Sequence, residues 1–177
     1  MKKSPQPSIH VSVPKQRLTL KRGGKTERTY PVSTSKFGLG SERGSMKTPL
    51  GRFRIAAKIG GDQPIDTAYK SREPLCPSAE MLKEDDLIMS RIMWLDGLEP
   101  HNANSYERYI YIHGTNHEEA IGEPSSHGCI RMRNADVAEL FDLVEVDTKV
   151  TIADRPLVSR SRKTARKALR RGSALPK

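Results

Sequence analysis

The sequence predicts a mainly β protein, built as a β-sandwich or a barrel-like pair of sheets. Two observations point to this class. About seven short segments alternate apolar and polar residues, and turn-forming residues separate them. Only one segment, residues 135–145, repeats its apolar residues at helical spacing, and it lies late in the chain. The pattern lacks the crossover helices that a parallel α/β sheet requires between its strands.

Four of the alternating segments lie in the first third of the chain. Residues 8–20 hold two runs around a central turn, which predicts a β-hairpin, and residues 28–33 and 52–59 predict two further strands. A stretch rich in Gly and Ser at 35–48 predicts a loop. Residues 60–77 combine weak periodicity with several chain-breaking residues, so we expect irregular structure there.

The remaining elements follow in the second half of the chain. Residues 86–95 are apolar enough to be buried, and their pattern favours a strand over a helix. The run before His113 alternates β-branched and aromatic residues, which predicts a buried strand that ends at this histidine. Asn134 precedes the helical segment 135–145 as a predicted N-cap, and residues 149–152 predict the last strand.

The positive charge of the chain is concentrated at its C-terminal end. The formal net charge is +10, and residues 155–177 hold nine Lys and Arg residues and no acid. The rest of the chain has 22 basic and 21 acidic residues, so it is close to neutral. We therefore predict an N-terminal extension (1–7), one globular domain (8–154) and a basic, disordered tail (155–177).

Three features of the sequence bear on the compartment. Two cysteines, Cys76 and Cys129, are too few for a disulfide framework. No apolar run approaches the roughly 20 residues that a membrane-spanning helix needs. Lys2 and Lys3 are followed by the Ser- and Pro-rich residues 4–8, where a secretory signal would have an apolar segment. The sequence as written therefore predicts no export signal.

The strongest chemical signal is the tetrapeptide Ser126-His127-Gly128-Cys129. A cysteine thiolate is a nucleophile, an imidazole can take up the thiol proton, and backbone N–H groups can hold an oxyanion. His113 and His127 are both candidate bases, and His127 would share a face with Cys129 on an extended chain. This combination predicts acyl transfer through a thioester.

These residues resemble the L,D-transpeptidase catalytic domain family, also called YkuD-like. The match rests on His-Gly-Thr at 113–115 and on Ser-His-Gly-Cys-Ile-Arg-Met at 126–132, with weaker support from Thr-Pro-Leu-Gly at 48–51. It extends over residues 8–153. The resemblance implies a mainly β, L,D-transpeptidase-like sandwich of mixed sheets, with one short helix after the catalytic cysteine.

The resemblance implies a peptidoglycan L,D-transpeptidase. The family's cysteine attacks the diamino-acid carbonyl of a stem tetrapeptide and releases D-alanine. The thioester then passes its acyl group to the amine of a second stem, which forms a 3→3 crosslink. Water as the acceptor would make the enzyme an L,D-carboxypeptidase, and a non-catalytic wall-binding module is a further alternative. Carbapenems are expected to acylate the same cysteine, and neither a cofactor nor a metal is implied.

The resemblance also bears on location and partners. The family's substrate lies outside the cytoplasmic membrane, which implies a periplasmic or wall-facing enzyme. The missing signal leaves open a cytoplasmic enzyme that acts on recycled muropeptides. The tail at 155–177 is either a solvated arm or an attachment to an anionic surface, such as phospholipid or wall polymer. The near-neutral domain and an aromatic content of 5% argue against specific nucleic acid binding.

The resemblance assigns roles to individual residues. Cys129 is the nucleophile, and His113 is the base, whose imidazole is oriented by the carbonyl of Gly114. The N–H groups of His127, Gly128 and Cys129 are the candidates for the oxyanion hole. The candidate substrate-binding residues are Ser126, His127, Arg131 and Tyr111.

Simpler interpretations exist for several of these residues. Ser126 alternatively shapes a turn, and Arg131 alternatively forms a structural ion pair. A zinc site made of His113, His117 and Cys129 is disfavoured, because a His-x₃-His pair shares one face only on a helix and the pattern there is that of a strand.

Overall fold

The computed structural model describes residues 5–84 and 86–155. Within these residues, ten strands are joined by hydrogen bonds into one sheet. The strand order is β3-β2-β1-β10-β4-β7, and from β7 one branch leads to β5 and β6 and another to β8 and β9. The strands are β1 (Pro7–Ser12), β2 (Arg17–Arg22), β3 (Lys25–Pro31), β4 (Gly51–Ile59), β5 (Ala68–Lys70), β6 (Glu73–Leu75), β7 (Ile88–Gly97), β8 (Tyr111–Thr115), β9 (Ile130–Met132) and β10 (Lys149–Ala153).

Helical structure is sparse in the described chain. It comprises α1 (Met81–Glu84), α2 (Asn134–Leu143) and two 3₁₀ turns at Ala103–Ser105 and Glu118–Ala120. None of the described helices is long and apolar enough to cross a membrane. All but the first residue of the predicted basic tail lies outside the described residues.

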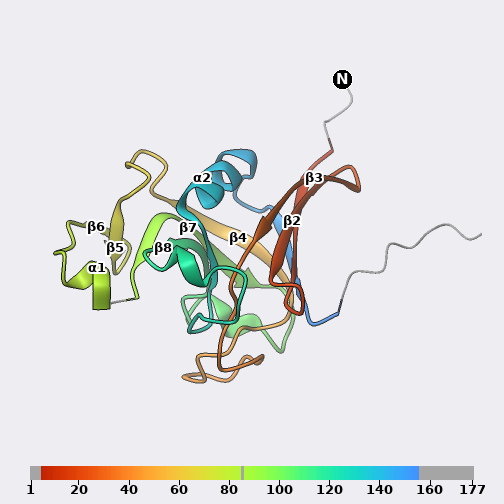
Figure 1. Ribbon diagram of the computed structural model, residues 1–177. Helices are drawn as coiled ribbons and strands as arrows, with labels where there is room; N and C mark the ends of the chain where they lie inside the picture. The colour runs from red at the N-terminus through yellow and green to blue at the C-terminus, as the bar shows by residue number, and fades with distance from the viewer. Residues whose placement is uncertain (1–4, 85, 156–177) are drawn as a thin grey trace, which may run out of the picture.

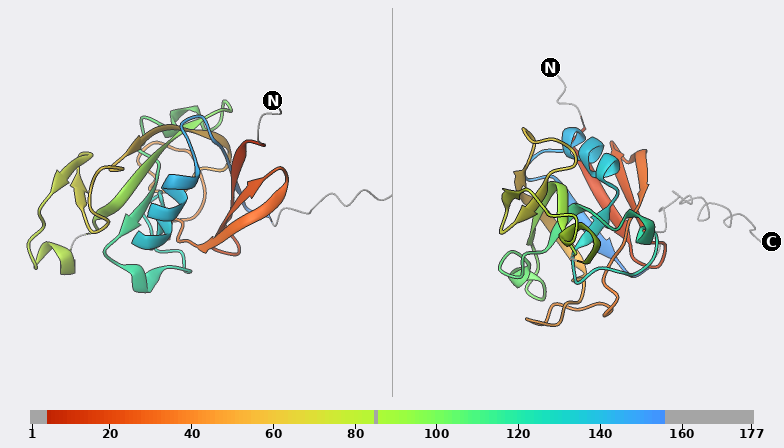
Figure 2. Two further views of the ribbon diagram at one scale, coloured as in Figure 1. Left: turned by 90° about the horizontal axis from the view of Figure 1, so that it is seen from above. Right: turned by 60° about the vertical axis from the view of Figure 1, so that its left-hand side comes forward.

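The sheet is mixed and strongly curved. β1 pairs with β10 and β8 pairs with β9 in parallel, whereas the other pairs are antiparallel. The two halves of the sheet face each other (Figures 1 and 2). Ser33, which follows β3, forms an antiparallel bridge with Arg131 in β9. The predicted mainly β, sandwich-like class is therefore confirmed, with one curved sheet in place of two separate sheets.

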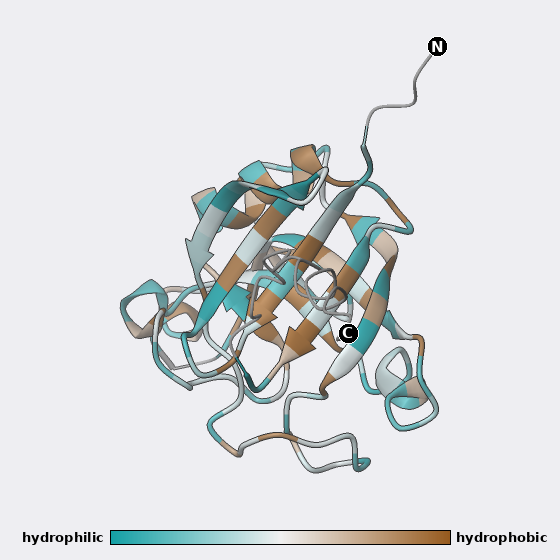
Figure 3. Cartoon of the chain, turned by 90° about the vertical axis from the view of Figure 1, so that its right-hand side faces the viewer, coloured by the Kyte–Doolittle hydropathy of each residue, from teal (hydrophilic) through white to brown (hydrophobic). Residues whose placement is uncertain are grey.

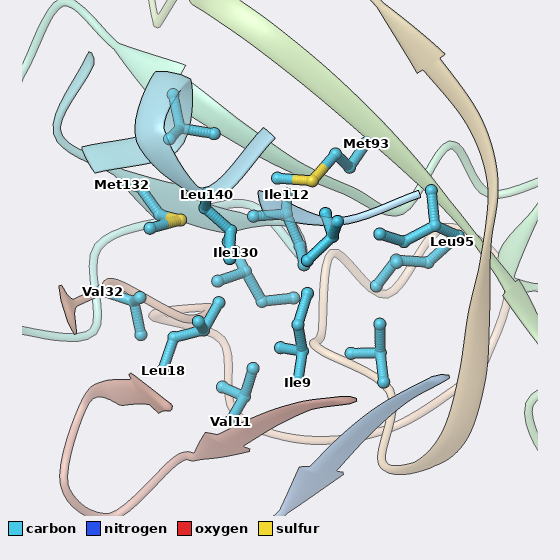
Figure 4. Close-up of a cluster of buried hydrophobic side chains, with 14 of the residues drawn as sticks. Ile9, Val11, Leu18, Val32, Met93, Leu95, Ile112, Ile130, Met132 and Leu140 are labelled. Atoms are coloured by element: carbon cyan, nitrogen blue, oxygen red, sulfur yellow. The ribbon is translucent and has the colours of Figure 1, made fainter. Parts of the chain in front are cut away.

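The main core fills the space between the two halves of the sheet. Hydrophilic and hydrophobic residues alternate along the strands (Figure 3), as expected when one face of each strand is buried. Ile9, Val11 and Leu18 approach from β1 and β2, and Ile112 and Leu140 approach from the opposite side (Figure 4). Burial of these side chains supplies most of the driving force that closes the two halves on each other.

Two predicted features of the strands need correction. Residues 60–77 are not wholly irregular, because β5 and β6 form a small hairpin there that also pairs with β7. Its turn residues Ser71 and Arg72 have φ angles of 51° and 72°, and neither is the Gly or Asn that would mark such a turn in a sequence. His113 lies in the middle of β8 and not at its end, since the strand continues to Thr115.

The predicted helix is confirmed, but its predicted cap is wrong. α2 packs against β7 and β8 through Val137, Leu140 and Phe141, which are buried. Asn134 is the first helical residue, and its side chain binds the backbone of Thr115 instead of capping the helix. The carboxylate of Glu118 accepts the Asn134 N–H at 2.6 Å, so an acid from elsewhere in the chain satisfies this helix end.

Candidate active site

The parallel pair β8–β9 brings the two halves of the sequence motif together. His113 is the register partner of Arg131, and Ile112 is that of Ile130. Cys129 directly precedes β9, and its Sγ accepts the backbone N–H of Tyr111 at 3.3 Å. The imidazole and the guanidinium therefore come from adjoining strands, and the thiol comes from the residue before the second of them.

The Cys129 thiol is held between two backbone groups. It accepts the Tyr111 N–H and donates to the carbonyl of Tyr109 at 3.3 Å. Tyr109 has a φ of 56°, an uncommon angle for a residue other than Gly, which turns the chain just before β8. Burial raises the pKa of the Cys129 thiol to about 11, and the Tyr111 N–H opposes this shift only in part. The thiol is therefore protonated at neutral pH.

His113 is neutral at the same pH and presents a defined tautomer. Its side chain is buried, with 4% exposed, and its Nδ1 lies 2.5 Å from the carbonyl oxygen of Gly114. Because a carbonyl can only accept, Nδ1 carries the proton and Nε2 keeps its lone pair. Burial lowers the pKa of His113 to about 4, although the Gly114 carbonyl raises it. The lone pair of Nε2 can thus accept a proton, as a general base requires.

Close packing explains the glycine that follows the histidine. A Cβ at Gly114 would collide with Oδ1 of Asn134 and would lie 2.7 Å from the carbonyl oxygen of Met89. The Asn134 amide occupies this space because it makes two hydrogen bonds of 3.0 Å to the Thr115 backbone. The absence of a side chain at Gly114 therefore lets α2 brace the strand that carries His113.

The turn before Cys129 is built on Gly128 and Ser126. Gly128 has a φ of 123°, in the region that L-residues rarely adopt. The Ser126 hydroxyl is buried, donates to the Cys129 carbonyl at 2.6 Å and accepts the Gly128 N–H at 3.2 Å. Thr48 donates to the Gly128 carbonyl at 2.9 Å, which gives the Thr-Pro-Leu-Gly segment a place in the site. These contacts favour the interpretation that Ser126 shapes the turn.

The three oxyanion-hole candidates differ in their present partners. The Gly128 N–H is bound to the Ser126 hydroxyl. For the N–H groups of His127 and Cys129, no hydrogen bond is found among the residues described. The assignment of an oxyanion hole to these groups stays a prediction.

An acid that the sequence analysis missed joins two candidate residues. One carboxylate oxygen of Asp86 lies 2.9 Å from Nδ1 of His127 and also pairs with the guanidinium of Arg131. The Arg131 side chain is only 6% exposed, whereas that of Asp86 is 33% exposed. This geometry favours the ion-pair interpretation of Arg131. It also gives His127 a carboxylate partner, which distinguishes it from His113.

The other candidate groups are accounted for. Tyr111 is buried, and its hydroxyl accepts a hydrogen bond from Arg72 at 3.4 Å. His117 lies 3.2 Å from a carboxylate oxygen of Glu119. Over residues 5–84 and 86–155, no group of three or more His, Cys, Asp or Glu residues is arranged to hold a metal ion. Arg72 and Asp86 gave no signal in the sequence, since each is far from the motif along the chain.

Comparison with known proteins identifies the family of the chain. The family model for the YkuD L,D-transpeptidase catalytic domain matches residues 6–152. The chain belongs to this family. It is 30% identical over 149 residues to the putative L,D-transpeptidase YqjB of Bacillus subtilis, with 84% of this chain and 72% of that protein covered. It is 31% identical over 144 residues to the putative L,D-transpeptidase YkuD of the same organism, with 81% and 64% covered.

Solved L,D-transpeptidases share the fold. The enzyme from Xylanimonas cellulosilytica superposes with a TM-score of 0.56 at 19% identity, over 86% of this chain and 63% of that one. L,D-transpeptidase 3 from Mycobacterium tuberculosis, in complex with a faropenem-derived adduct, has a TM-score of 0.53 at 18% identity, over 84% and 60%. The chain thus spans about 60% of these structures.

Proposed function

We propose that the chain is a peptidoglycan L,D-transpeptidase that forms 3→3 crosslinks through a thioester on Cys129. The observation that carries the proposal is the pairing of β8 and β9. It brings a neutral imidazole, free at Nε2, onto β8 and a protonated thiol to the residue before β9. Membership of the YkuD family supports the same chemistry.

Acylation then proceeds as follows. The Cys129 Sγ attacks the diamino-acid carbonyl of a stem tetrapeptide while Nε2 of His113 takes up the thiol proton. The N–H groups of His127 and Cys129 hold the oxyanion of the tetrahedral intermediate, and Gly128 joins them if its N–H leaves Ser126. When the intermediate collapses, the C–N bond breaks, and His113 gives its proton to the amine of the departing D-alanine.

The second half-reaction decides the product. The amine of a second stem attacks the thioester, His113 accepts a proton from it, and the Cys129 thiolate leaves and is reprotonated. Water in place of the amine gives an L,D-carboxypeptidase from the same thioester, which is the second candidate function. The non-catalytic wall-binding module is the weakest candidate, since both Cys129 and His113 are in place.

Substrate contacts and location are part of the proposal. His127, Tyr111 and Arg131 are the proposed substrate contacts, and Arg131 can bind a substrate carboxylate only if that carboxylate replaces Asp86. We place the enzyme where peptidoglycan is exposed, in the periplasm or facing the wall. Carbapenems are expected to acylate Cys129, as relatives have been solved with imipenem and with a faropenem-derived adduct.

The test is intact-mass analysis after incubation with a disaccharide-tetrapeptide muropeptide. The parent protein should form an adduct or release D-alanine, and the Cys129→Ala variant should do neither. Cys76→Ala is the matched control, because Cys76 is the second free cysteine and is exposed; it should behave like the parent. A dimeric product indicates the transpeptidase, and a tripeptide product indicates the carboxypeptidase. A folded protein that shows neither adduct nor turnover would reject both.

A further inference from the structure

Trp94 and three tyrosines form a cluster of rings near the candidate nucleophile, called here the aromatic wall. Trp94 stacks on Tyr106 with ring centroids 4.0 Å apart, and it also contacts Tyr109 and Tyr111 at 5.7 and 5.4 Å. Two of these residues contact Cys129 through their backbones, since the Tyr109 carbonyl accepts a hydrogen bond from the thiol and the Tyr111 N–H donates one to the sulfur. Tyr109 keeps 52% of its surface exposed, so the wall is open to solvent on this side.

Arg72, at the turn of the β5–β6 hairpin, places a positive charge on this wall. Its guanidinium carbon lies 4.9 Å from the ring centroid of Trp94 and 5.3 Å from that of Tyr109. One guanidinium nitrogen donates to the Tyr111 hydroxyl at 3.4 Å. Cation–π contacts of this kind hold an arginine in place while leaving the edge of its planar fork available to hydrogen-bond a carboxylate.

The two arginines whose charges act on the Cys129 thiol, Arg131 and Arg108, already have partners. Arg131 is paired with Asp86. Arg108 donates to the carbonyls of Gly40 and Lys47 at 3.3 and 2.9 Å. Arg72 has no carboxylate partner among the residues that the structure describes. Arg108 also has no carboxylate partner there, but both of its terminal nitrogens donate to backbone carbonyls, whereas the hydrogen bond found for Arg72 is the one to the Tyr111 hydroxyl. More donors of the Arg72 fork are therefore available to a ligand.

The position of Arg72 suits one part of a peptide donor. Tyr111 separates the two groups, with its N–H on the sulfur and its hydroxyl on Arg72. In a donor, the terminal carboxylate lies one residue beyond the attacked carbonyl, about 3.5 Å along an extended chain. A charge-assisted hydrogen bond adds about 2.8 Å. A leaving group that extends along the Tyr111 side chain toward its hydroxyl would bring this carboxylate toward the Arg72 guanidinium.

We propose that Arg72 binds the terminal carboxylate of the residue that leaves during acylation, and so restricts the enzyme to donors that end one residue after the attacked carbonyl. This inference rests on the proposed function, because it names the recognition element for its leaving group. The guanidinium forms two parallel hydrogen bonds to the carboxylate, and the aromatic wall keeps the fork in position. A donor without this charge, or with a longer chain, loses the contact.

The first experiment does not depend on peptidoglycan activity. In a Cys76→Ala background, Cys129 reacts with anionic 2-sulfonatoethyl methanethiosulfonate or with its cationic trimethylammonioethyl analogue. Each reagent forms a disulfide with Sγ and releases methanesulfinate. Each also carries its charge as many bonds from Sγ as the carboxylate carbon of a bound donor. The measured quantity is the ratio of the anionic to the cationic rate, followed by intact mass.

The variants separate the charge of Arg72 from general effects. Arg72→Gln should lower the rate ratio about tenfold, the order expected for a lost charge-assisted hydrogen bond, and Arg72→Lys should lower it less. Arg43→Gln removes the same charge from an exposed loop position and should leave the ratio unchanged. An unchanged ratio in both Arg72 variants, each folded by circular dichroism, would overturn the inference.

The second experiment uses a stem tetrapeptide with either a terminal carboxylate or a terminal carboxamide. The parent enzyme should prefer the carboxylate about tenfold in kcat/KM, and Arg72→Gln should lose this preference. Equal preference in the parent and in Arg72→Gln would contradict the assignment. If neither peptide reacts, the proposed function fails, and the reagent ratio still decides the role of the Arg72 charge.

Discussion

The Asn134 side chain binds the backbone of Thr115 through two hydrogen bonds, each 3.0 Å long. It accepts a hydrogen bond from the Thr115 N–H and donates one to the Thr115 carbonyl, so both backbone polar groups of Thr115 are paired. The first turn of α2 is thereby attached to the end of β8, two residues after His113. The position of the candidate base thus depends on a helix that follows the nucleophile in the sequence.

This arrangement predicts a strong effect of Gly114→Ala. The new methyl group would collide with the Asn134 amide and crowd the Met89 carbonyl, so we expect a loss of several kcal/mol in the free energy of unfolding, on the order of 3 kcal/mol. Asn134→Ala alone should cost about 2 kcal/mol by leaving the Thr115 groups unsatisfied. Urea unfolding of both single variants and of the double variant should show a double loss smaller than the sum. Simple additivity would contradict the predicted contact.

The half-buried thiol of Cys129 and the buried imidazole of His113 predict that stability is lost at both acid and alkaline pH, in an acid limb and an alkaline limb. The pKa of His113 falls from 6.5 to about 4 on folding, so the unfolded chain binds more protons, and stability is lost as pH falls from 6.5 toward 4. The pKa of Cys129 rises from 9.0 to about 11, so stability is lost as pH rises from 9 toward 11. Melting temperatures measured across pH should be highest between 6.5 and 9.

Two variants test the assignment of these limbs. Cys129→Ala should flatten the alkaline limb and leave the acid limb in place, and His113→Gln should do the reverse. Cys76→Ala is the control for the thiol, and it should leave both limbs unchanged. An alkaline limb that survives Cys129→Ala would show that another group titrates there.

Asp86 is predicted to restrain the reactivity of the thiol. Its carboxylate raises the pKa of Cys129, although burial is the larger cause of the raised value. Asp86→Asn should therefore lower the pKa of Cys129 and speed its alkylation by iodoacetamide at neutral pH. It should also cost about 2 kcal/mol of stability, because the buried Arg131 loses its carboxylate partner. Asp66→Asn, at an exposed position, is the charge-matched control.

Gly128 and Gly122 are two glycines with φ angles that other residues rarely adopt, so they can be compared by substitution. Their φ angles are 123° and 112°, so Ala at either position should cost roughly 1–3 kcal/mol. Only Gly128 adjoins the nucleophile, and its N–H and carbonyl are held by Ser126 and Thr48. We expect Gly128→Ala to slow acylation of Cys129 at least about tenfold and Gly122→Ala to leave it unchanged. Equal acylation rates in the two variants would contradict a role for Gly128 in the candidate active site.

The sequence motif was enough to indicate a candidate site because its residues are local. Ser126 to Cys129 form one turn, and the Gly114 carbonyl is the next carbonyl along the chain from His113. Alternation of apolar residues likewise indicated most strands, and their helical spacing indicated α2, since a strand or helix with one buried face repeats its pattern at short range. The hairpin of β5 and β6 escaped this reasoning, because its turn uses Ser71 and Arg72 in place of Gly or Asn.

What the sequence by itself determined is the mainly β class, the family, and the residue types at the candidate nucleophile and base. Only the tertiary structure decided which residues from distant segments meet them. Asp86 reaches His127 and Arg131, Asn134 braces Thr115, and Arg72 lies on the aromatic wall. The physical reason is that periodicity and motif spacing report local geometry. Contacts between distant segments depend instead on how the curved sheet closes over its core.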